Sequence, residues 1–331
     1  MVRSKAGNFA PQVGFLETYF ANMVELYIQG MPAYELHRLD PLRDSAELVP
    51  DDWFRIAAEI HRRDESFDGF VLIHGTDTMA YTASALSFLL EGLDKPVVMT
   101  GSQLSLEDPR SDGREHIVTS ILIAGTLQIP EVSVYFASKL LRGNCAQKIN
   151  NHAFEAFGSG NIEPLAHIGT EISVNEHLLR LPGAGLGAAV ELKRHPKVVS
   201  IRLYPGLDGG TLERFLDDEL DAVVLETYGA GNAPTGSGTG GVLKVIERAI
   251  AQRGIIVVNC SQCHGGAVRQ ELYSTGARLA HVGVLSGHDM TPEAALTKLY
   301  CGFARGFAAK RVRAMMERDV AGEMSVPRVV S

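Results

Sequence analysis

The stretch Phe70-Val-Leu-Ile-His-Gly-Thr-Asp-Thr-Met79 predicts a buried strand, a sharp turn and the start of a helix. Its first four residues are bulky and apolar, which is typical of a strand inside a parallel sheet. Gly75 lets the backbone turn sharply after that strand. The helix is expected from Thr78 to Glu91, where apolar residues recur with a period near 3.6. A strand followed directly by a helix indicates a parallel sheet with crossover helices.

The same alternation continues along the chain in two separate regions. It breaks up between about residues 150 and 196, where Gly183-Ala-Gly-Leu-Gly187 is typical of a linker. Further strands are expected at 96–100, 132–136, 198–203, 222–226 and 255–259, and further helices at 113–127, 210–220, 241–252 and 291–305. The last of these helices is expected to begin with a threonine cap followed by Pro292.

The chain is therefore expected to be an α/β protein built from two α/β domains. Residues 1–185 are assigned to a larger amino-terminal domain with a mainly parallel sheet, and residues 186–195 to a linker. Residues 196–331 are assigned to a smaller carboxyl-terminal domain with a parallel sheet. The length of 331 residues fits this division, because it is about twice the usual size of a single domain.

Composition excludes several classes of function. The formal net charge is −8 and basic residues form no long run, which argues against nucleic-acid and anionic-membrane partners. No apolar run reaches the roughly 18 residues of a membrane span, and the amino terminus lacks the apolar core of a signal peptide. The four cysteines do not form a disulfide framework. We therefore expect a soluble, cytoplasmic protein.

Three strand-to-helix junctions carry polar residues where α/β sheets bind ligands. At the first, Asp77 beside Thr76 suits an ammonium group, and helix amides favour an anion, but Asp77 or Thr78 as a helix cap is an equally good interpretation. The second, Met99-Thr-Gly-Ser-Gln103, is explained at least as well by turn chemistry. The third, Glu226-Thr-Tyr-Gly-Ala-Gly-Asn-Ala-Pro234, offers a polar rim that an ordinary loop would share.

Other motifs give weaker signals. Gly236-Ser-Gly-Thr-Gly-Gly241 matches a dinucleotide pattern but lies well past its strand. Cys260-Ser-Gln-Cys263 lacks a second pair of zinc ligands, and packing is the commoner role of such thiols. The histidines are scattered, so a catalytic metal is not expected. Taken alone, Lys148 would be assigned to the solvated surface; beside a threonine and a carboxylate, it could serve as a base.

Together these residues resemble the type I (cytoplasmic) L-asparaginase family over essentially the whole chain. The most specific element is His74-Gly-Thr-Asp-Thr-Met-Ala-Tyr-Thr-Ala83. Further matching motifs are Asp44-Ser45, Pro50-Asp-Asp-Trp53, Arg110-Ser-Asp-Gly113, Tyr228-Gly-Ala-Gly-Asn232 and Asp289-Met-Thr291. A chance match to this ordered set is implausible.

The resemblance implies hydrolysis of L-asparagine to L-aspartate and ammonia without a cofactor. Thr76, Asp77 and Lys148 match the family's catalytic Thr-Asp-Lys triad, and Asp77 would also hold the α-ammonium group of the substrate. Asp44 and Ser45 match the loop that receives the α-amino and α-carboxylate end. Asn232 matches a residue that a neighbouring subunit contributes, which implies a homodimer or homotetramer.

Three features depart from the family pattern. The family begins with a strand ending in Thr-Gly-Gly-Thr-Ile-Gly, whose second threonine is the usual acylating nucleophile. This chain starts at Met1-Val-Arg-Ser, so that nucleophile and the first strand are expected to be missing, either because the true start lies upstream or because the product is crippled. Phe9 replaces a tyrosine that assists the nucleophile. Glu226 replaces an arginine of the allosteric asparagine site, so allostery is not expected.

The resulting expectation is an asparaginase that acts through a threonine acyl-enzyme. Two alternatives stay open. One is the asparaginase-like subunit of a tRNA amidotransferase, which usually carries an extra amino-terminal domain. The other is a catalytically weak or inactive asparagine-binding homologue, which the missing nucleophile favours. Ammonia release from asparagine separates the three.

Overall fold

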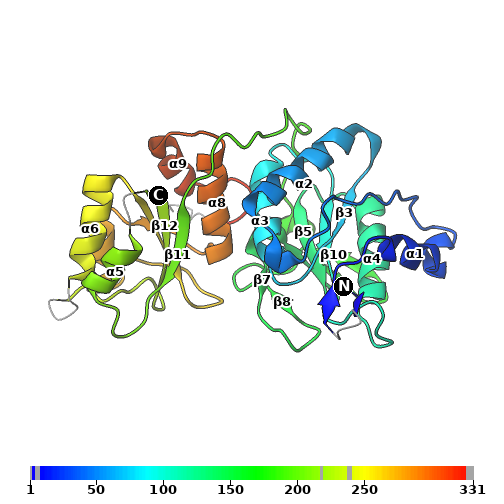
Figure 1. The fold of residues 1–331 in the computed structure, drawn as a ribbon, viewed down its shortest axis with the longest axis horizontal. Coiled ribbons are helices and arrows are strands. Elements are labelled where there is room, and N and C mark those ends of the chain that lie inside the picture. Colours follow the sequence, from blue (N-terminus) through cyan, green and yellow to red (C-terminus); the bar gives the residue numbers. More distant parts are fainter. Residues whose placement is uncertain (1, 4–7, 217–218, 237–240, 326–331) are drawn as a thin grey trace. The chain divides into compact units, whose positions relative to one another are not determined.

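The computed structural model describes residues 2–3, 8–216, 219–236 and 241–325. The chain forms two compact units, Met1–Val190 and Glu191–Ser331 (Figure 1). The boundary at residue 190 falls within the range 186–195, although the exact extent of the linker stays a prediction. Both units have the α/β architecture expected from the sequence.

The first unit contains a six-stranded sheet in the order β10-β9-β6-β5-β4-β3. The strands β3, β4 and β5 are parallel, as expected, whereas β6, β9 and β10 join the sheet through antiparallel pairs. The sheet is therefore mixed, and the expectation of a mainly parallel sheet was wrong for this half. The strands are β3 (Phe70–Ile73), β4 (Val97–Thr100), β5 (Val132–Phe136), β6 (Lys139–Arg142), β9 (Ala166–Ile168) and β10 (Ile172–Val174).

The reversal of direction occurs at the hairpin between β5 and β6. Its two connecting residues, Ala137 and Ser138, have φ angles of 47° and 64°. Two left-handed residues in succession form the type of turn that matches the twist of paired strands. The sequence lacks the Asn-Gly or Asp-Gly pair that usually marks this turn, so the antiparallel half was not recognised from sequence.

Three helices of the first unit pack on this sheet or on each other. Helix α4 (Gly113–Thr126) contacts β3 and β4, whereas α3 (Met79–Leu89) contacts β5 and η4 (Gly143–Cys145). Helix α2 (Pro50–Arg63) lies against α3. Shorter elements are β1 (Val2–Arg3), β2 (Phe9–Ala10), α1 (Phe15–Ala21), η1 (Val24–Tyr27), η2 (Ser45–Glu47), η3 (Asp64–Ser66), β7 (Gln147–Lys148), β8 (Phe157–Gly158) and η5 (Glu176–Leu178).

The second unit contains a fully parallel sheet in the order β11-β12-β13-β14, as expected. The two faces of this sheet are covered by different apolar clusters. One cluster includes Leu212 of α5, Val245 of α6 and Leu279 of α7, and the other includes Leu299 of α8 and Val312 of α9. The elements are β11 (Val198–Arg202), α5 (Gly209–Phe215), β12 (Ala222–Thr227), α6 (Val242–Arg253), β13 (Ile256–Ser261), α7 (Ser274–His281), β14 (Leu285–Ser286), α8 (Pro292–Ala304) and α9 (Ala309–Met316).

The start of α8 and the end of α5 can be compared directly with the helix ends predicted from the sequence. The Thr291 hydroxyl accepts a hydrogen bond from the Ala294 amide at 3.0 Å, which confirms the expected threonine cap of α8. Helix α5 ends at Phe215 and not at residue 220. Residues 217–218 of that expected helix lie outside the described residues.

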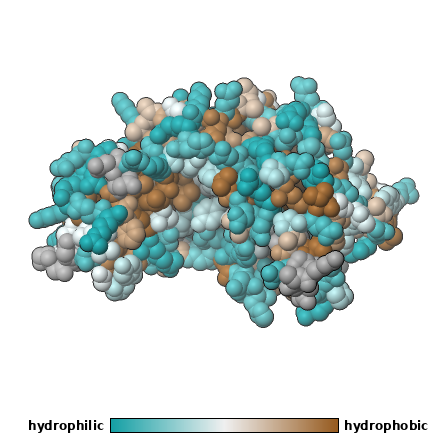
Figure 2. Space-filling view, in the orientation of Figure 1, coloured by the Kyte–Doolittle hydropathy of each residue, from teal (hydrophilic) through white to brown (hydrophobic). Residues whose placement is uncertain are grey.

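Strand β3 forms one edge of the sheet in the first unit. Within the described residues it pairs only with β4, and all four of its side chains are partly exposed. On the face shown in Figure 2, hydrophilic side chains predominate and hydrophobic ones gather in several places. In the described part of the chain, the helices are too short or too polar to cross a membrane.

Candidate active site

The first strand-to-helix junction places Thr76 and Asp77 directly after β3. Helix α3 begins at Met79, with Thr78 in the capping position, and no side chain forms the cap hydrogen bond. The Asp77 carboxylate instead contacts the amine of Lys148, at 2.6 Å from Oδ1 to Nζ. The structure therefore gives no support to Asp77 or Thr78 as a side-chain helix cap.

Lys148 joins the two residues of this turn through one amine. Its Nζ donates a hydrogen bond to the Thr76 hydroxyl at 2.8 Å and another to Asp77. The lysine lies on the short strand β7, which pairs with β8 in an antiparallel hairpin with Lys148 opposite Phe157. Only 19% of the Lys148 side chain is exposed, whereas 64% of the Asp77 side chain is exposed. The structure thus brings together all three members of the expected triad.

Asp44 and Ser45 lie beside the same turn. A Cβ atom added to Gly75 would lie 2.4 Å from the Ser45 Oγ, so only glycine fits against this serine. The Thr78 hydroxyl donates to the backbone carbonyl of Ser45 at 2.8 Å. The Asp44 carboxylate accepts the Ala46 amide and thereby begins the short helix η2. These contacts bring Ser45, with Asp44 adjacent to it in the chain, to the end of β3.

His74 contacts the turn between β3 and α3, and α3 itself, through its two ring nitrogens, and no role was predicted for it from the sequence. Its Nδ1 lies 2.6 Å from the Gly75 carbonyl oxygen, and its Nε2 lies 3.0 Å from the Thr82 hydroxyl. Burial lowers the pKa of His74, and the contact with the Gly75 carbonyl opposes this shift only partly. A neutral imidazole therefore bridges the turn to the first part of α3. The signal available in the sequence was a histidine directly before a turn glycine.

An open hollow of about 460 Å³ adjoins this group of side chains. Its lining comprises Asp77, Lys148, Ile149, Asn150 and Asn151. The volume lies within the range of small-molecule sites. Asn150 and Asn151 were not predicted, because their only sequence signal is that they lie two and three positions after Lys148.

Asn232 and the third junction belong to the second unit. The Asn232 side chain accepts a hydrogen bond from the Thr275 hydroxyl at 2.8 Å, and its backbone pairs with Tyr228. The Glu226 carboxylate accepts a hydrogen bond from Ser200 and lies 3.6 Å from Arg202. The structure therefore shows an internally bonded loop there, and the role of Asn232 across a subunit interface stays a prediction.

The weaker motifs gain no support as sites. The Cys260 thiol is fully buried among apolar side chains, and burial raises its pKa, which suits packing and not metal binding. Among the described residues, no group of three histidine, cysteine, aspartate or glutamate side chains could hold a metal ion. Most of the glycine-rich stretch from Gly236 to Gly241 lies outside the described residues.

Comparison with known proteins identifies the family of both units. The family description "Asparaginase, N-terminal" matches residues 3–180, and "Glutaminase/Asparaginase C-terminal domain" matches residues 197–316. The chain belongs to the asparaginase family. The resemblance expected from the sequence is thereby confirmed over nearly the whole chain.

This asparaginase-family chain is similar over most of its length to two L-asparaginases and to one amidotransferase subunit. L-asparaginase 1 of Escherichia coli is 40% identical, with 98% of this chain and 94% of the relative covered. The crystal structure of L-asparaginase I from Vibrio cholerae is 39% identical with a TM-score of 0.87, covering 96% and 95% of the two chains. A glutamyl-tRNA(Gln) amidotransferase subunit of Pyrococcus abyssi is 34% identical, with 85% of this chain but only 65% of the relative covered.

Proposed function

We propose that this chain hydrolyses L-asparagine to L-aspartate and ammonia through a threonine acyl-enzyme. The observation that carries the proposal is the position of the Lys148 amine, within hydrogen-bond distance of both the Thr76 hydroxyl and the Asp77 carboxylate. An unactivated hydroxyl is a weak nucleophile and needs an adjacent base. The Lys148 amine lies 2.8 Å from the hydroxyl oxygen and, once it has lost its proton, would meet this requirement.

In the first step, the neutral Lys148 amine accepts the proton of the Thr76 hydroxyl. The threonine oxygen attacks the side-chain amide carbon of asparagine and forms a tetrahedral oxyanion. Hydrogen-bond donors placed at this oxyanion would stabilise it. Collapse breaks the carbon–nitrogen bond, and ammonia leaves with the proton returned by Lys148.

In the second step, water hydrolyses the threonine ester. Lys148 removes a proton from the water, the resulting hydroxide attacks the ester carbon, and the bond to the threonine oxygen breaks. The threonine oxygen regains its proton and aspartate is released. Among the described residues, Thr76 is the threonine whose hydroxyl contacts the lysine amine, so we assign the ester to Thr76 in this chain.

Substrate binding is assigned to the groups around the same turn. Asp77 is more than half exposed, so its carboxylate is free to pair with the α-ammonium group when Lys148 is neutral. Asp44 and Ser45 are assigned to the α-amino and α-carboxylate end. By the same resemblance, we propose a cytoplasmic homodimer or homotetramer in which Asn232 serves a neighbouring subunit.

The test is ammonia release from L-asparagine by the purified chain alone, compared with the Thr76→Val variant. Valine has nearly the shape of threonine but no hydroxyl, so the variant should lose nearly all turnover. Valine-variant activity equal to that of the parent would remove Thr76 from the chemistry. Asparagine binding detected by calorimetry, together with no ammonia release, would support the alternative of an inactive asparagine-binding homologue.

A second candidate function rests on the similarity to the amidotransferase relative. In that case the ammonia would be transferred to a partner protein. The chain spans only 65% of that relative, which leaves a large part of the relative unmatched. Asparagine hydrolysis by the chain alone at an ordinary enzymatic rate would favour the asparaginase.

A further inference from the structure

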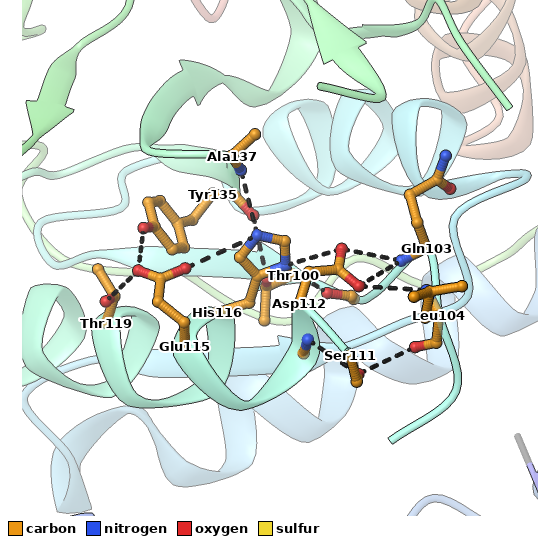
Figure 3. A network of polar contacts seen from close by, with 12 residues as sticks. Thr100, Gln103, Leu104, Ser111, Asp112, Glu115, His116, Thr119, Tyr135 and Ala137 are labelled. Carbon is orange, nitrogen blue, oxygen red and sulfur yellow. Dashed lines mark hydrogen bonds and ion pairs between the residues drawn. The ribbon is translucent and has the colours of Figure 1, made fainter. Parts of the chain in front are cut away.

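Two motifs have no role in the proposed chemistry: Met99-Thr-Gly-Ser-Gln103 at the end of β4 and Arg110-Ser-Asp-Gly113 at the start of α4. The structure joins them through one carboxylate. Both oxygens of Asp112 accept the backbone amide of Gln103, at 2.9 and 3.1 Å, and one also accepts the Leu104 amide. Figure 3 shows Asp112 facing the loop 101–104, while the Gln103 side chain points away from the carboxylate.

The loop 101–104 is also fixed against the turn that carries Thr76. His116 of α4 lies 2.8 Å from the Gly101 carbonyl oxygen through Nδ1 and accepts the Ala137 amide through Nε2 (Figure 3). A Cβ atom on Gly101 would lie 2.3 Å from the His74 carbonyl oxygen, so the loop backbone rests directly on His74. One side of the loop is therefore held at the end of β3.

The other side of the loop reaches the segment that follows Lys148. The Gln103 side-chain amide donates to the Ala153 carbonyl at 3.0 Å and lies 3.5 Å from the Asn150 carbonyl. Asn150 in turn accepts the His152 and Ala153 amides with its side-chain oxygen. The segment 149–153 thus forms a tight turn, and its backbone is tied to the loop after β4.

We propose that Gln103, oriented by Asp112, is a positioning residue for Lys148. This inference rests on the proposed function, because it assigns Gln103 the task of holding the lysine hairpin against Thr76 and Asp77. The pair β7–β8 has only two residues in each strand, so it supplies little rigidity of its own. The Gln103 side-chain amide adds a hydrogen bond to the segment that follows Lys148. Proton transfer depends steeply on the position of the lysine amine relative to the threonine hydroxyl.

The test compares Gln103→Met, which keeps the size but removes the donor, with Gln103→Glu, which points oxygen at two carbonyl oxygens. We expect kcat for asparagine to fall about three- to tenfold in the methionine variant and further in the glutamate variant, with KM changed less than about twofold. The matched control is Asn175→Leu, which removes a side-chain bond to the Pro164 carbonyl in the same unit. That control should leave kcat unchanged.

A second readout follows Lys148 without relying on turnover. Reductive methylation of lysines, quantified by peptide mass spectrometry, should modify Lys148 faster in Gln103→Met than in the parent. Lys95 is the internal standard, because its side chain is also 19% exposed and it is bonded to the Asp64 and Phe67 carbonyls. Its methylation rate should not change.

The outcomes separate this inference from the proposed function. Unchanged kcat, or an unchanged Lys148 methylation rate, in Gln103→Met would overturn the positioning role even if the parent is an active asparaginase. If the parent releases no ammonia, the proposed function fails. The positioning role of Gln103 is then decided by the ratio of the Lys148 and Lys95 methylation rates in Gln103→Met and in the parent. Asp112→Asn should lower kcat in the parent but add little in the Gln103→Met background, because both act through the same tie.

Discussion

Replacement of Asp77 by asparagine tests whether this carboxylate binds the substrate or only stabilises the fold. Asparagine keeps the shape and removes the charge that would orient the α-ammonium group. A charge-assisted hydrogen bond contributes about 1.5–3 kcal/mol, which corresponds to a roughly tenfold to hundredfold loss of affinity for asparagine. The loss of kcat/KM should be larger, because a misoriented amide is presented poorly to the nucleophile.

The structure also sets the expected effect on stability. Asp77 forms no helix cap, and its ion pair with Lys148 has one side chain that is 64% exposed. Exposed ion pairs contribute at most about 1 kcal/mol because solvent screens them. Loss of that amount would lower the melting temperature of the first unit by no more than about 2–4 °C.

The assay measures melting temperature together with kinetics on asparagine and on succinamate, which lacks the α-amino group. We expect succinamate to bind weakly to the parent and to lose little in Asp77→Asn. Equal losses for the two substrates would refute the assignment of Asp77 to the ammonium group. A lower melting temperature with the substrate ranking unchanged would point to a structural role only.

Three further outcomes are expected. Lys148→Met should abolish turnover while aspartate binding, measured by calorimetry, persists, because the lysine acts on the threonine proton; retained turnover would exclude the lysine. Addition of an amino-terminal Thr-Gly-Gly-Thr strand, for which the outer edge of β3 is unpaired in the described residues, should leave turnover of the same order, because Thr76 is the proposed nucleophile; a rise of several orders of magnitude would assign the ester to the added threonine instead. His74→Gln should lose less stability than the parent between about pH 7.5 and about pH 5.5. Burial lowers the pKa of His74 below its ordinary 6.5. The contribution of neutral His74 to the free energy of unfolding is therefore complete above pH 6.5 and decreases as the pH falls, because the unfolded chain binds the proton more readily. Equal pH dependence of the melting temperature in the parent and in His74→Gln would contradict this.

Local sequence patterns were sufficient for the parallel strands β3, β4, β5, β11, β12 and β13 and for several helices, but not for the antiparallel strands or for α2, α7 and α9. The strand ending at Ile73, the glycine turn and the helix from Met79 follow from apolar runs and backbone chemistry within a short window. The cap at Thr291 is equally local, because its hydroxyl bonds an amide three residues ahead. The family motifs added the expected catalytic roles of Thr76, Asp77 and Lys148, and the matches to known proteins confirmed the family.

Only the tertiary structure decided how these residues meet. Thr76 and Lys148 are 72 positions apart, and the distance between them depends on the hairpin β7–β8 and on the ties from Gln103 and Asp112. The antiparallel half of the sheet likewise depends on two left-handed residues, Ala137 and Ser138, whose identities give little sign of that conformation. Hydrophobic periodicity reports which side of an element is buried, whereas contacts between distant loops depend on packing that no local pattern encodes.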